Sequence, residues 1–220
     1  MRINQFLAKH TDLSRRKADD VVAEGRVEIN GILALPGDMV IESDHVTLDN
    51  ALVTPTTKTY VLIFHKPAGY VVSREGQGSK TIYDILPADY HHLNPVGRLD
   101  KDSSGLLLIT NDGELANQLT HPRYSKQKTY LVQLDKALKV HDQDAIADKG
   151  VVLEDGMSKL GLTPLDGTHK HWQVTMREGR NRQIRRTFAA LGYKVTSLHR
   201  THFGDYELKD LKSGEFSVIV

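Results

Sequence analysis

The sequence has no cysteine among its 220 residues. Disulfide bonds and thiolate zinc sites are therefore excluded, and the absence fits a reducing compartment. No apolar run approaches the roughly 20 residues that a membrane-spanning helix needs, and the first ten residues are too polar for a secretory signal. We therefore expect a cytoplasmic protein with no membrane partner.

The overall charge is nearly balanced, but its distribution is uneven. The composition, 39% hydrophobic and 26% charged, is that of an ordinary globular protein, and the net charge is +1. Between Lys170 and His202, however, eight cations face a single anion, Glu178. Charge this segregated indicates that one face of the molecule meets a polyanion.

The N-terminal part of the chain has the pattern of a small separate module, residues 1–48. Ser14 is a suitable N-cap for a helix over residues 15–24, and Asn30-Gly31 is typical of a tight hairpin turn. Residues 49–59, with one proline and several threonines, are the predicted linker. The remainder, 60–220, is predicted to be a second, larger domain.

The most informative stretch of the larger domain surrounds Asp100. This carboxylate stands between Arg98 and a Ser-Ser-Gly turn, and the apolar run 106–109 that follows reads as a core strand. Asp100 is therefore predicted to lie on a loop anchored by rigid structure. It is either a turn aspartate bonded to its own backbone, or a nucleophile or acid/base that a nearby guanidinium keeps ionised.

The run from Gly97 to Leu108 resembles the signature of the RsuA/RluB/RluE/RluF-type RNA pseudouridine synthases. The resemblance implies that Asp100 is the essential catalytic carboxylate. Lys128-Thr-Tyr130 is similar to the second motif of that family, whose tyrosine stacks on the target base, although spacing alone makes Tyr130 an ordinary core residue of a strand.

A third segment, Gly179 to Arg186, is similar to the third motif of the family, and by that resemblance Arg185 pairs with Asp100. Leu198 matches the apolar residue that lines the pocket beneath the uracil. The resemblance and the local charge together give these further substrate-binding candidates: Arg98, Lys128, Arg182 and Arg186.

Residues 14–18 and 25–31 are similar to the S4 RNA-binding module, which commonly precedes the catalytic domain in this family. The resemblance implies that residues 1–48 dock RNA. Cations at a helix start are suited to phosphate. The expected phosphate contacts are Arg2, Lys9, Arg15, Arg16, Lys17 and Arg26.

The expected fold is α+β: an S4-like module of helices and a short β-hairpin, then a domain with a mixed, mainly antiparallel sheet flanked by helices. Residues 60–65 read as a strand, the segment 66–69 as a turn, and 70–72 as its hairpin partner. Residues 182–191 read as a helix that Gly192 ends.

These features predict an isomerase that converts a specific uridine of RNA to pseudouridine. Ribosomal RNA, 16S or 23S, is the expected partner, with tRNA as the alternative, and we expect a monomer. The reaction needs no redox step or external energy, so neither cofactor nor metal is expected.

Two other functions stay open. The first is a non-catalytic RNA-binding factor in ribosome assembly that retains the fold. The second is a glycosidic-bond hydrolase, which normally needs two carboxylates flanking the bond. Asp102 is the nearby second carboxylate, but no family motif supports it.

Overall fold

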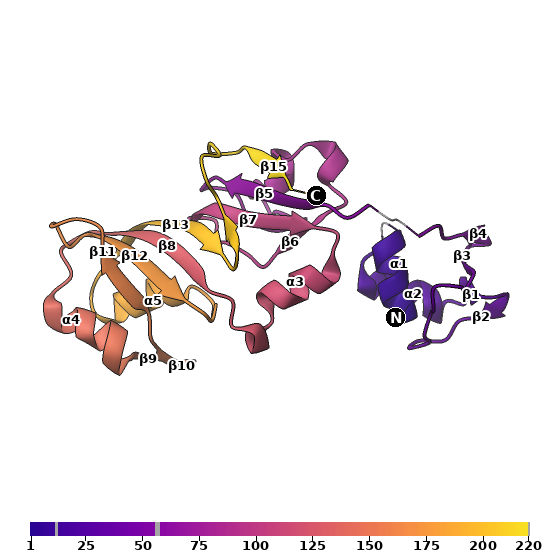
Figure 1. Ribbon diagram of the computed structural model, residues 1–220, viewed down its shortest axis with the longest axis horizontal. Helices are drawn as coiled ribbons and strands as arrows, with labels where there is room; N and C mark the ends of the chain where they lie inside the picture. The colour runs from indigo at the N-terminus through magenta and orange to yellow at the C-terminus, as the bar shows by residue number, and fades with distance from the viewer. Residues whose placement is uncertain (12, 56–57, 220) are drawn as a thin grey trace. The chain divides into compact units, whose positions relative to one another are not determined.

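The computed structural model describes residues 1–11, 13–55 and 58–219 (Figure 1). The chain divides into two compact units. Unit 1 comprises Met1–Thr59 with Asn111–Gly113, and unit 2 comprises Tyr60–Thr110 with Glu114–Val220. Among the described residues, no helix combines the length and the apolar character needed to cross a bilayer.

Unit 1 packs two helices against a small four-stranded sheet with the order β2-β1-β3-β4. Ile3, Leu7 and Val22 of the helices share one core with Val27 of the sheet. The elements are α1 (Ile3–His10), α2 (Arg15–Ala23), β1 (Val27–Ile29), β2 (Ile32–Leu33), β3 (Val46–Leu48) and β4 (Ala51–Leu52). The Ser14 side chain accepts a hydrogen bond from the Lys17 backbone amide, which confirms the predicted N-cap.

The segment predicted as a linker starts too early in the chain. Asp49 and Asn50 have positive φ angles of 51° and 63° and form the turn between β3 and β4. Val53 is buried in the core of unit 1. The linker prediction relied on the threonines and the proline and overlooked Asp49-Asn50 as a pair of turn-forming residues. Thr56 and Thr57 lie outside the described residues.

Unit 2 is built on a nine-stranded sheet. Seven of its strands follow the order β11-β12-β8-β13-β7-β5-β15, and the other two, β6 and β14, pair with β7 and β13 respectively. The β13–β7 pair is parallel and the other described pairs are antiparallel. The predicted α+β class with a mixed, mainly antiparallel sheet is therefore confirmed. The strands are β5 (Val61–Lys66), β6 (Asn94–Val96), β7 (Ser104–Thr110), β8 (Lys128–Leu134), β11 (Gly161–Pro164), β12 (His171–Met176), β13 (Val195–Phe203), β14 (Tyr206–Glu207) and β15 (Phe216–Val218).

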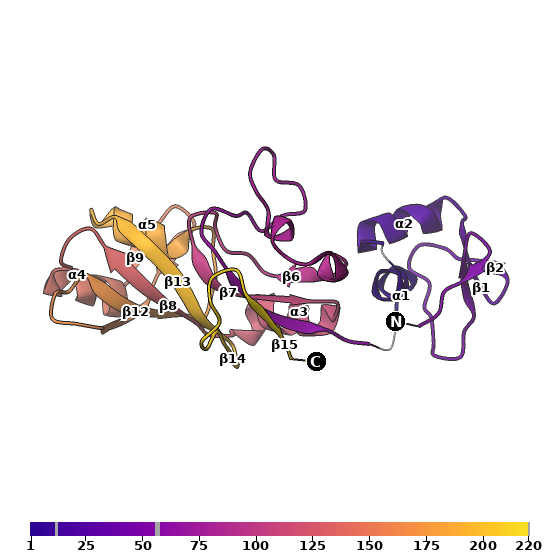
Figure 2. The same ribbon diagram turned by 90° about the horizontal axis from the view of Figure 1, so that it is seen from above.

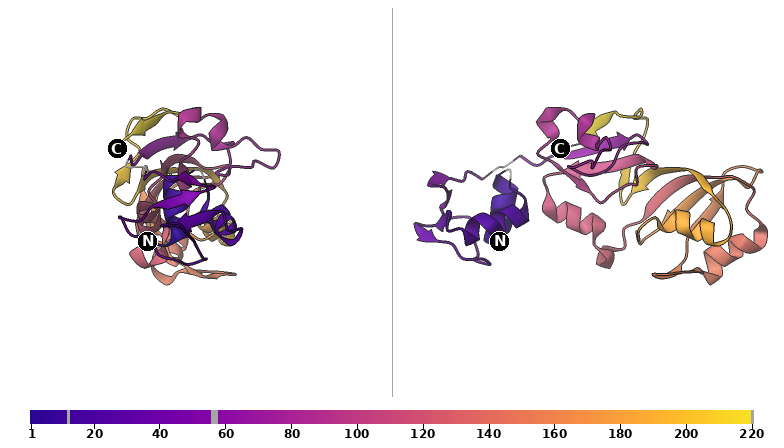
Figure 3. Two further views of the ribbon diagram at one scale, coloured as in Figure 1. Left: turned by 90° about the vertical axis from the view of Figure 1, so that its right-hand side faces the viewer. Right: turned by 180° about the vertical axis from the view of Figure 1, so that it is seen from behind.

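Helices cover both faces of this sheet. The central strand β7 is buried on both sides, since Leu107 and Leu106 point into two different cores. α3 (Gly113–Thr120) packs Leu119 against the core of Leu106, beside β6 and β7 (Figures 1 and 2). α5 (Gln183–Ala190) packs on the other core, along β13 (Figures 1 and 3).

Shorter elements complete unit 2. A separate hairpin pairs β9 (Val151–Leu153) with β10 (Gly156–Ser158). The helical segments are the 3₁₀ turns Ile82–Asp84, Ala88–Tyr90 and Pro122–Tyr124, the helix α4 (Val140–Asp144) and the π-helical turn Ala145–Lys149.

The hairpin predicted for residues 60–72 is wrong. β5 pairs with β7 and β15, and residues 70–72 contribute only an isolated bridge between Val71 and Thr81. The turn after β5 leads the chain elsewhere, because the Gly69 amide donates to the Lys101 carbonyl at 2.6 Å. The turn thus supports the loop that carries Asp100.

Candidate active site

A cleft of about 1000 Å³ lies in unit 2, lined by segments that are far apart in the sequence. The loop before β7 contributes Asp100, the start of β8 contributes Tyr130, the loop before α5 contributes Arg182, and β13 contributes Leu198. Three of the sequence motifs singled out above therefore meet in one cavity.

The loop that carries Asp100 is fastened from below by Lys66. The Ser103 amide donates to the Asp100 carbonyl at 3.1 Å, which closes a turn. The ammonium of Lys66, fully buried at the end of β5, donates to the carbonyls of Pro67, Asp100 and Ser103 at 3.0, 3.1 and 2.8 Å. Burial lowers the pKa of Lys66 to about 8, so the ammonium is still the main form at neutral pH.

A row of residues in register joins this loop to the base of the cleft. Lys66 pairs with Gly105 in β7, Gly105 with Arg200 in β13, and Arg200 with Tyr130 in β8. A Cβ added to Gly105 would lie 2.2 Å from the Arg200 carbonyl oxygen, and the residue has a φ of 108°. Only glycine allows β7 and β13 to approach this closely, and the approach brings the Asp100 loop beside the strand of Tyr130.

The carboxylate of Asp100, 30% exposed, forms its ion pair with Arg182. Nη1 of Arg182 lies 3.3 Å from Oδ2 of Asp100. The same guanidinium donates to both carboxylate oxygens of Asp102, at 3.0 and 2.9 Å. This bidentate hydrogen bond is the main reason that the pKa of Asp102 lies below its ordinary value.

The expected pairing of Arg185 with Asp100 is corrected by this arrangement. Nε of Arg185 lies 3.3 Å from Asp102, and its other nitrogens donate to the carbonyls of Val195 and Asp102, both at 2.9 Å. The helix begins at Gln183, and Arg182 before it has a left-handed φ of 46°. Its side chain therefore leaves the direction that a helical wheel assigns and points to the loop.

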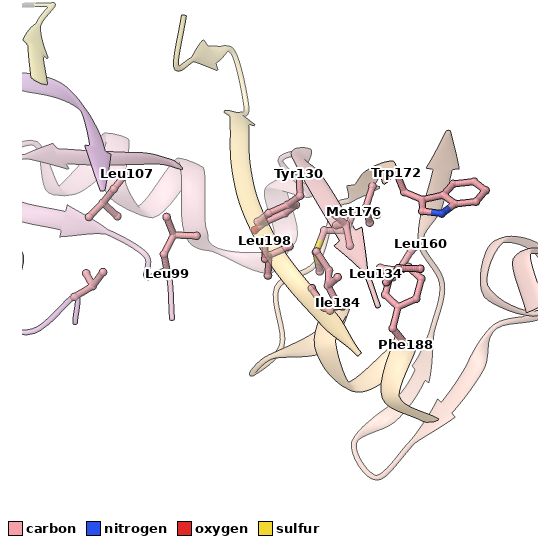
Figure 4. Close-up of a cluster of buried hydrophobic side chains, with 14 of the residues drawn as sticks. Leu99, Leu107, Tyr130, Leu134, Leu160, Trp172, Met176, Ile184, Phe188 and Leu198 are labelled. Atoms are coloured by element: carbon pink, nitrogen blue, oxygen red, sulfur yellow. The ribbon is translucent and has the colours of Figure 1, made fainter. Parts of the chain in front are cut away.

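The apolar base of the cleft is formed by Tyr130 and Leu198 with Met176 and Ile184 (Figure 4). Tyr130 and Leu198 lie on the neighbouring strands β8 and β13, and each is 7% exposed. An aromatic ring beside an aliphatic side chain is suited to holding a planar base. A carboxylate–arginine pair that lines the same cleft as this apolar surface can perform chemistry on a nucleotide.

The RNA pseudouridylate synthase family matches residues 60–190. A solved structure described as a pseudouridylate synthase is 31% identical, with a TM-score of 0.70 over 100% of this chain and 96% of that one. The chain belongs to the RNA pseudouridylate synthase family. It is therefore an isomerase that acts on RNA.

Sequence relatives of the synthase extend over nearly its whole length. The ribosomal large subunit pseudouridine synthase B of Bacillus subtilis is 35% identical over 97% of this chain and 90% of the relative. The ribosomal small subunit pseudouridine synthase A of Pasteurella multocida is 36% identical over 98% and 94%. An uncharacterized RNA pseudouridine synthase of Aquifex aeolicus is 36% identical over 98% and 89%.

The cleft of the synthase is strongly positive. Eight cations and two carboxylates are found in its lining. Arg98, Lys128 and Arg182 of the predicted substrate-binding set are among these cations. Arg186 lies outside the lining and pairs with Asp155 of the β9–β10 hairpin at 2.6 Å.

Arg200 was missed from the sequence. Lys66 begins the turn 66–69, which also resembles the opening motif of the family, and the sequence left both a plain hairpin and a direct catalytic role open for that turn. Lys66 is the last residue of an apolar strand, where a lysine is ordinarily expected to face solvent. Arg200 is buried, 2% exposed, and lines the cleft. A signal existed for Arg200, because it lies two residues after Leu198 and therefore on the same face of the strand.

Proposed function

We propose that this synthase isomerises a uridine of ribosomal RNA, with Asp100 as the catalytic carboxylate. The observation that carries the proposal is that Asp100, Tyr130 and Leu198 line a single cleft, with the Asp100 carboxylate held by Arg182. The large- and small-subunit names of the relatives support ribosomal RNA as the substrate class. The cytoplasmic location expected from the sequence belongs to the same proposal.

The target nucleotide is extruded from its helix or loop, at a cost of a few kcal/mol, before the chemistry. Tyr130 and Leu198 receive the base. The N1–C1′ bond then breaks, the C5–C1′ bond forms, C5 loses its proton and N1 gains one, so that the product is an isomer of the substrate. Asp100 acts in its ionised form, and the Arg182 guanidinium orients it within the cleft.

Arg185 has a different role in this scheme from the one expected. Through Asp102 and the Val195 carbonyl it ties the Asp100 loop to α5 and β13. Asp102 is engaged by both arginines. That engagement disfavours the hydrolase alternative, which needs a second carboxylate available at the bond.

Residues 1–48, which form most of unit 1, are proposed to be an S4-like RNA-docking module. The side chains of Arg2, Lys9, Arg15, Arg16 and Lys17 are exposed, and no described carboxylate forms an ion pair with them. Arg26, in contrast, is held by Asp49 at 2.6 Å and by Glu24 at 3.0 Å. The docking proposal therefore rests on the first five cations.

The test is turnover on transcribed 16S and 23S ribosomal RNA carrying tritium at C5 of uridine, with tRNA as a third substrate. We expect tritium release from one ribosomal RNA and a carbodiimide-reactive pseudouridine at a defined position. Asp100→Asn keeps the shape of the side chain and is expected to lower turnover by at least about 10²–10⁴-fold, with RNA affinity nearly unchanged.

The same assay separates the alternatives. Release of free uracil identifies a glycosidic-bond hydrolase. Tight binding of ribosomal RNA without pseudouridine identifies a binding factor. Turnover by Asp100→Asn at the wild-type rate overturns the assignment of Asp100.

A further inference from the structure

Two cations of the cleft, the half-buried Lys128 and the buried Arg200, form no ion pair with any described carboxylate. Arg180, Arg182 and Lys126 in the same lining are matched by carboxylates. Three other cations of the lining, Arg98, Lys159 and Arg177, are exposed and can be solvated by water. Lys128 is half-buried and Arg200 is 2% exposed, so neither charge is compensated in this way.

Phe203 holds these two cations without neutralising them. The Lys128 ammonium lies 5.1 Å from the centre of its ring, and the Arg200 guanidinium carbon 4.8 Å. Arg200 Nε donates to the Leu106 carbonyl at 2.8 Å, but its buried Nη2 has no hydrogen-bond partner. A cation–π contact stabilises a cation and leaves its charge available to an anion.

The arrangement costs stability unless an anion completes it. Burial, together with the neighbouring charge of Arg200, lowers the pKa of Lys128. Uncompensated buried charge is unfavourable, and one further polar group is left without a bond. A phosphate supplies a full negative charge and several acceptor oxygens, whereas a uracil carbonyl supplies no charge.

The position of this pair fits the RNA backbone next to the target base. Arg200 pairs in register with Tyr130, and Phe203 pairs with Lys128, two residues before Tyr130 in β8. Two strand residues span about 7 Å, a length within one nucleotide. Arg200 thus lies level with the tyrosine that receives the base, and Lys128 lies two residues further along the strand.

We propose that Lys128, Arg200 and Phe203 form a subsite for a backbone phosphodiester adjacent to the target uridine. Lys128, the more exposed cation, contacts the phosphate, and Arg200 reinforces it from below. The assignment rests on the proposed function, since it takes the nucleotide at Tyr130 to be the substrate. The subsite would align the RNA chain in the cleft through one of its backbone phosphates.

The test is the salt dependence of RNA binding, measured on a transcribed ribosomal RNA fragment that contains the modified uridine. Lys128→Gln removes one phosphate contact. We expect about tenfold weaker binding at low salt and a slope of log Kd against log salt that is smaller by about 0.7–1. The matched control is Lys170→Gln, which removes the same charge at the opposite end of β12 from the cleft residue Met176 and is expected to leave the slope unchanged.

A second arm locates the phosphate. A single neutral methylphosphonate next to the target uridine is expected to weaken RNA binding by the wild-type protein. Lys128→Gln, which already lacks the phosphate contact, is expected to bind the methylphosphonate RNA almost as well as it binds the unmodified RNA. Equal weakening of both proteins overturns the subsite, as does a wild-type slope in Lys128→Gln. Arg200→Gln is expected to act in the same direction; if it fails to fold, Lys128→Gln still decides.

Turnover by the wild-type protein is measured on the same RNA. Absence of pseudouridine there overturns the proposed function, whereas the salt slope is read from binding alone and judges the subsite. The two failures are therefore distinguishable.

Discussion

At the scale of single residues, Lys66 is important to the site although it has no part in the proposed reaction. Its ammonium is the shared donor to three backbone carbonyls, two of which belong to the turn that carries Asp100. A buried charge is tolerated when every one of its donors is used. Lys66 is therefore a positioning residue that holds the Asp100 loop at the end of β5 through these hydrogen bonds.

Lys66→Met keeps the length of the side chain and removes the donor. Leaving the buried carbonyls without it is expected to destabilise the fold by about 1–3 kcal/mol. Displacement of the loop by as little as 1 Å is expected to lower kcat by up to about 10²-fold. Denaturant unfolding and tritium release measure the two effects. Lys101→Met, an exposed lysine on the same loop, is the control, and a full loss of kcat there would argue against a specific role for Lys66.

The residues of the cleft differ in how far the sequence could predict them. Asp100, Tyr130 and Leu198 lie in recognisable motifs, and the cleft contains all three, although their roles stay predictions. The arginine partner was assigned wrongly because the left-handed φ of Arg182 is a property of the loop before the helix. The burial of Lys66 could not be predicted, because it depends on a turn 34 residues further along the chain.

At the scale of elements, the site depends on a link between the loop before β7 and the start of α5. Asp102 provides this link, because it binds Arg182 through both oxygens and lies 3.3 Å from Arg185. A second acidic residue, Asp155 in the β9–β10 turn, binds Arg180 and Arg186. Two short acidic turns therefore hold the arginine-rich segment in place.

Asp102→Asn is expected to reduce the dependence of stability on acid pH. Because the Arg182 bond lowers the pKa of Asp102 in the folded state, the unfolded chain binds this proton more readily. The stabilisation by Asp102 is therefore present above about pH 4, its unfolded pKa, and is lost as the pH falls through the lower folded pKa. Wild-type and variant unfolding free energies should differ at pH 6, and the difference should shrink toward acid pH, for example at about pH 2. Asp210→Asn, an exposed aspartate elsewhere, is the control, and an equal difference at both pH values would contradict the linkage.

Local patterns predicted the elements whose signals are themselves local. The apolar run of β7, the cap of α2 and the Asn30-Gly31 turn follow from a few adjacent residues, and all three are found. The hairpin over 60–72 failed because strand pairing is decided between distant segments. β5 pairs with β7 and β15 and not with residues 70–72, which follow it in the sequence. The Lys-Pro-Ala-Gly turn between β5 and these residues does not indicate which strands β5 will pair with.

At the scale of the whole molecule, the charge that we propose to face RNA is divided between two units, for which we propose different tasks. Unit 2 has the cleft with its carboxylate, whereas unit 1 has exposed cations at the start of α2. Phosphate contacts of the kind proposed for unit 1 position an RNA without taking part in bond rearrangement. The two units should therefore affect different kinetic constants.

Replacing Arg15, Arg16 and Lys17 together by glutamine tests this division in the full-length protein. If each contacts a phosphate, the slope of log Kd against log salt falls by about 2, since single strands contribute about 0.7 for each contact. KM should rise with the weaker binding while kcat stays constant, the pattern expected when an interaction is equal in ground and transition states. Arg26→Gln is the matched control within the same unit, because Asp49 and Glu24 already engage that guanidinium, and its effect should be small. A fall in kcat at unchanged KM for the triple variant would show that α2 acts on the chemical step. If Arg26→Gln reduced the salt slope by as much as one third of the reduction in the triple variant, RNA would have to displace the carboxylate partners of Arg26.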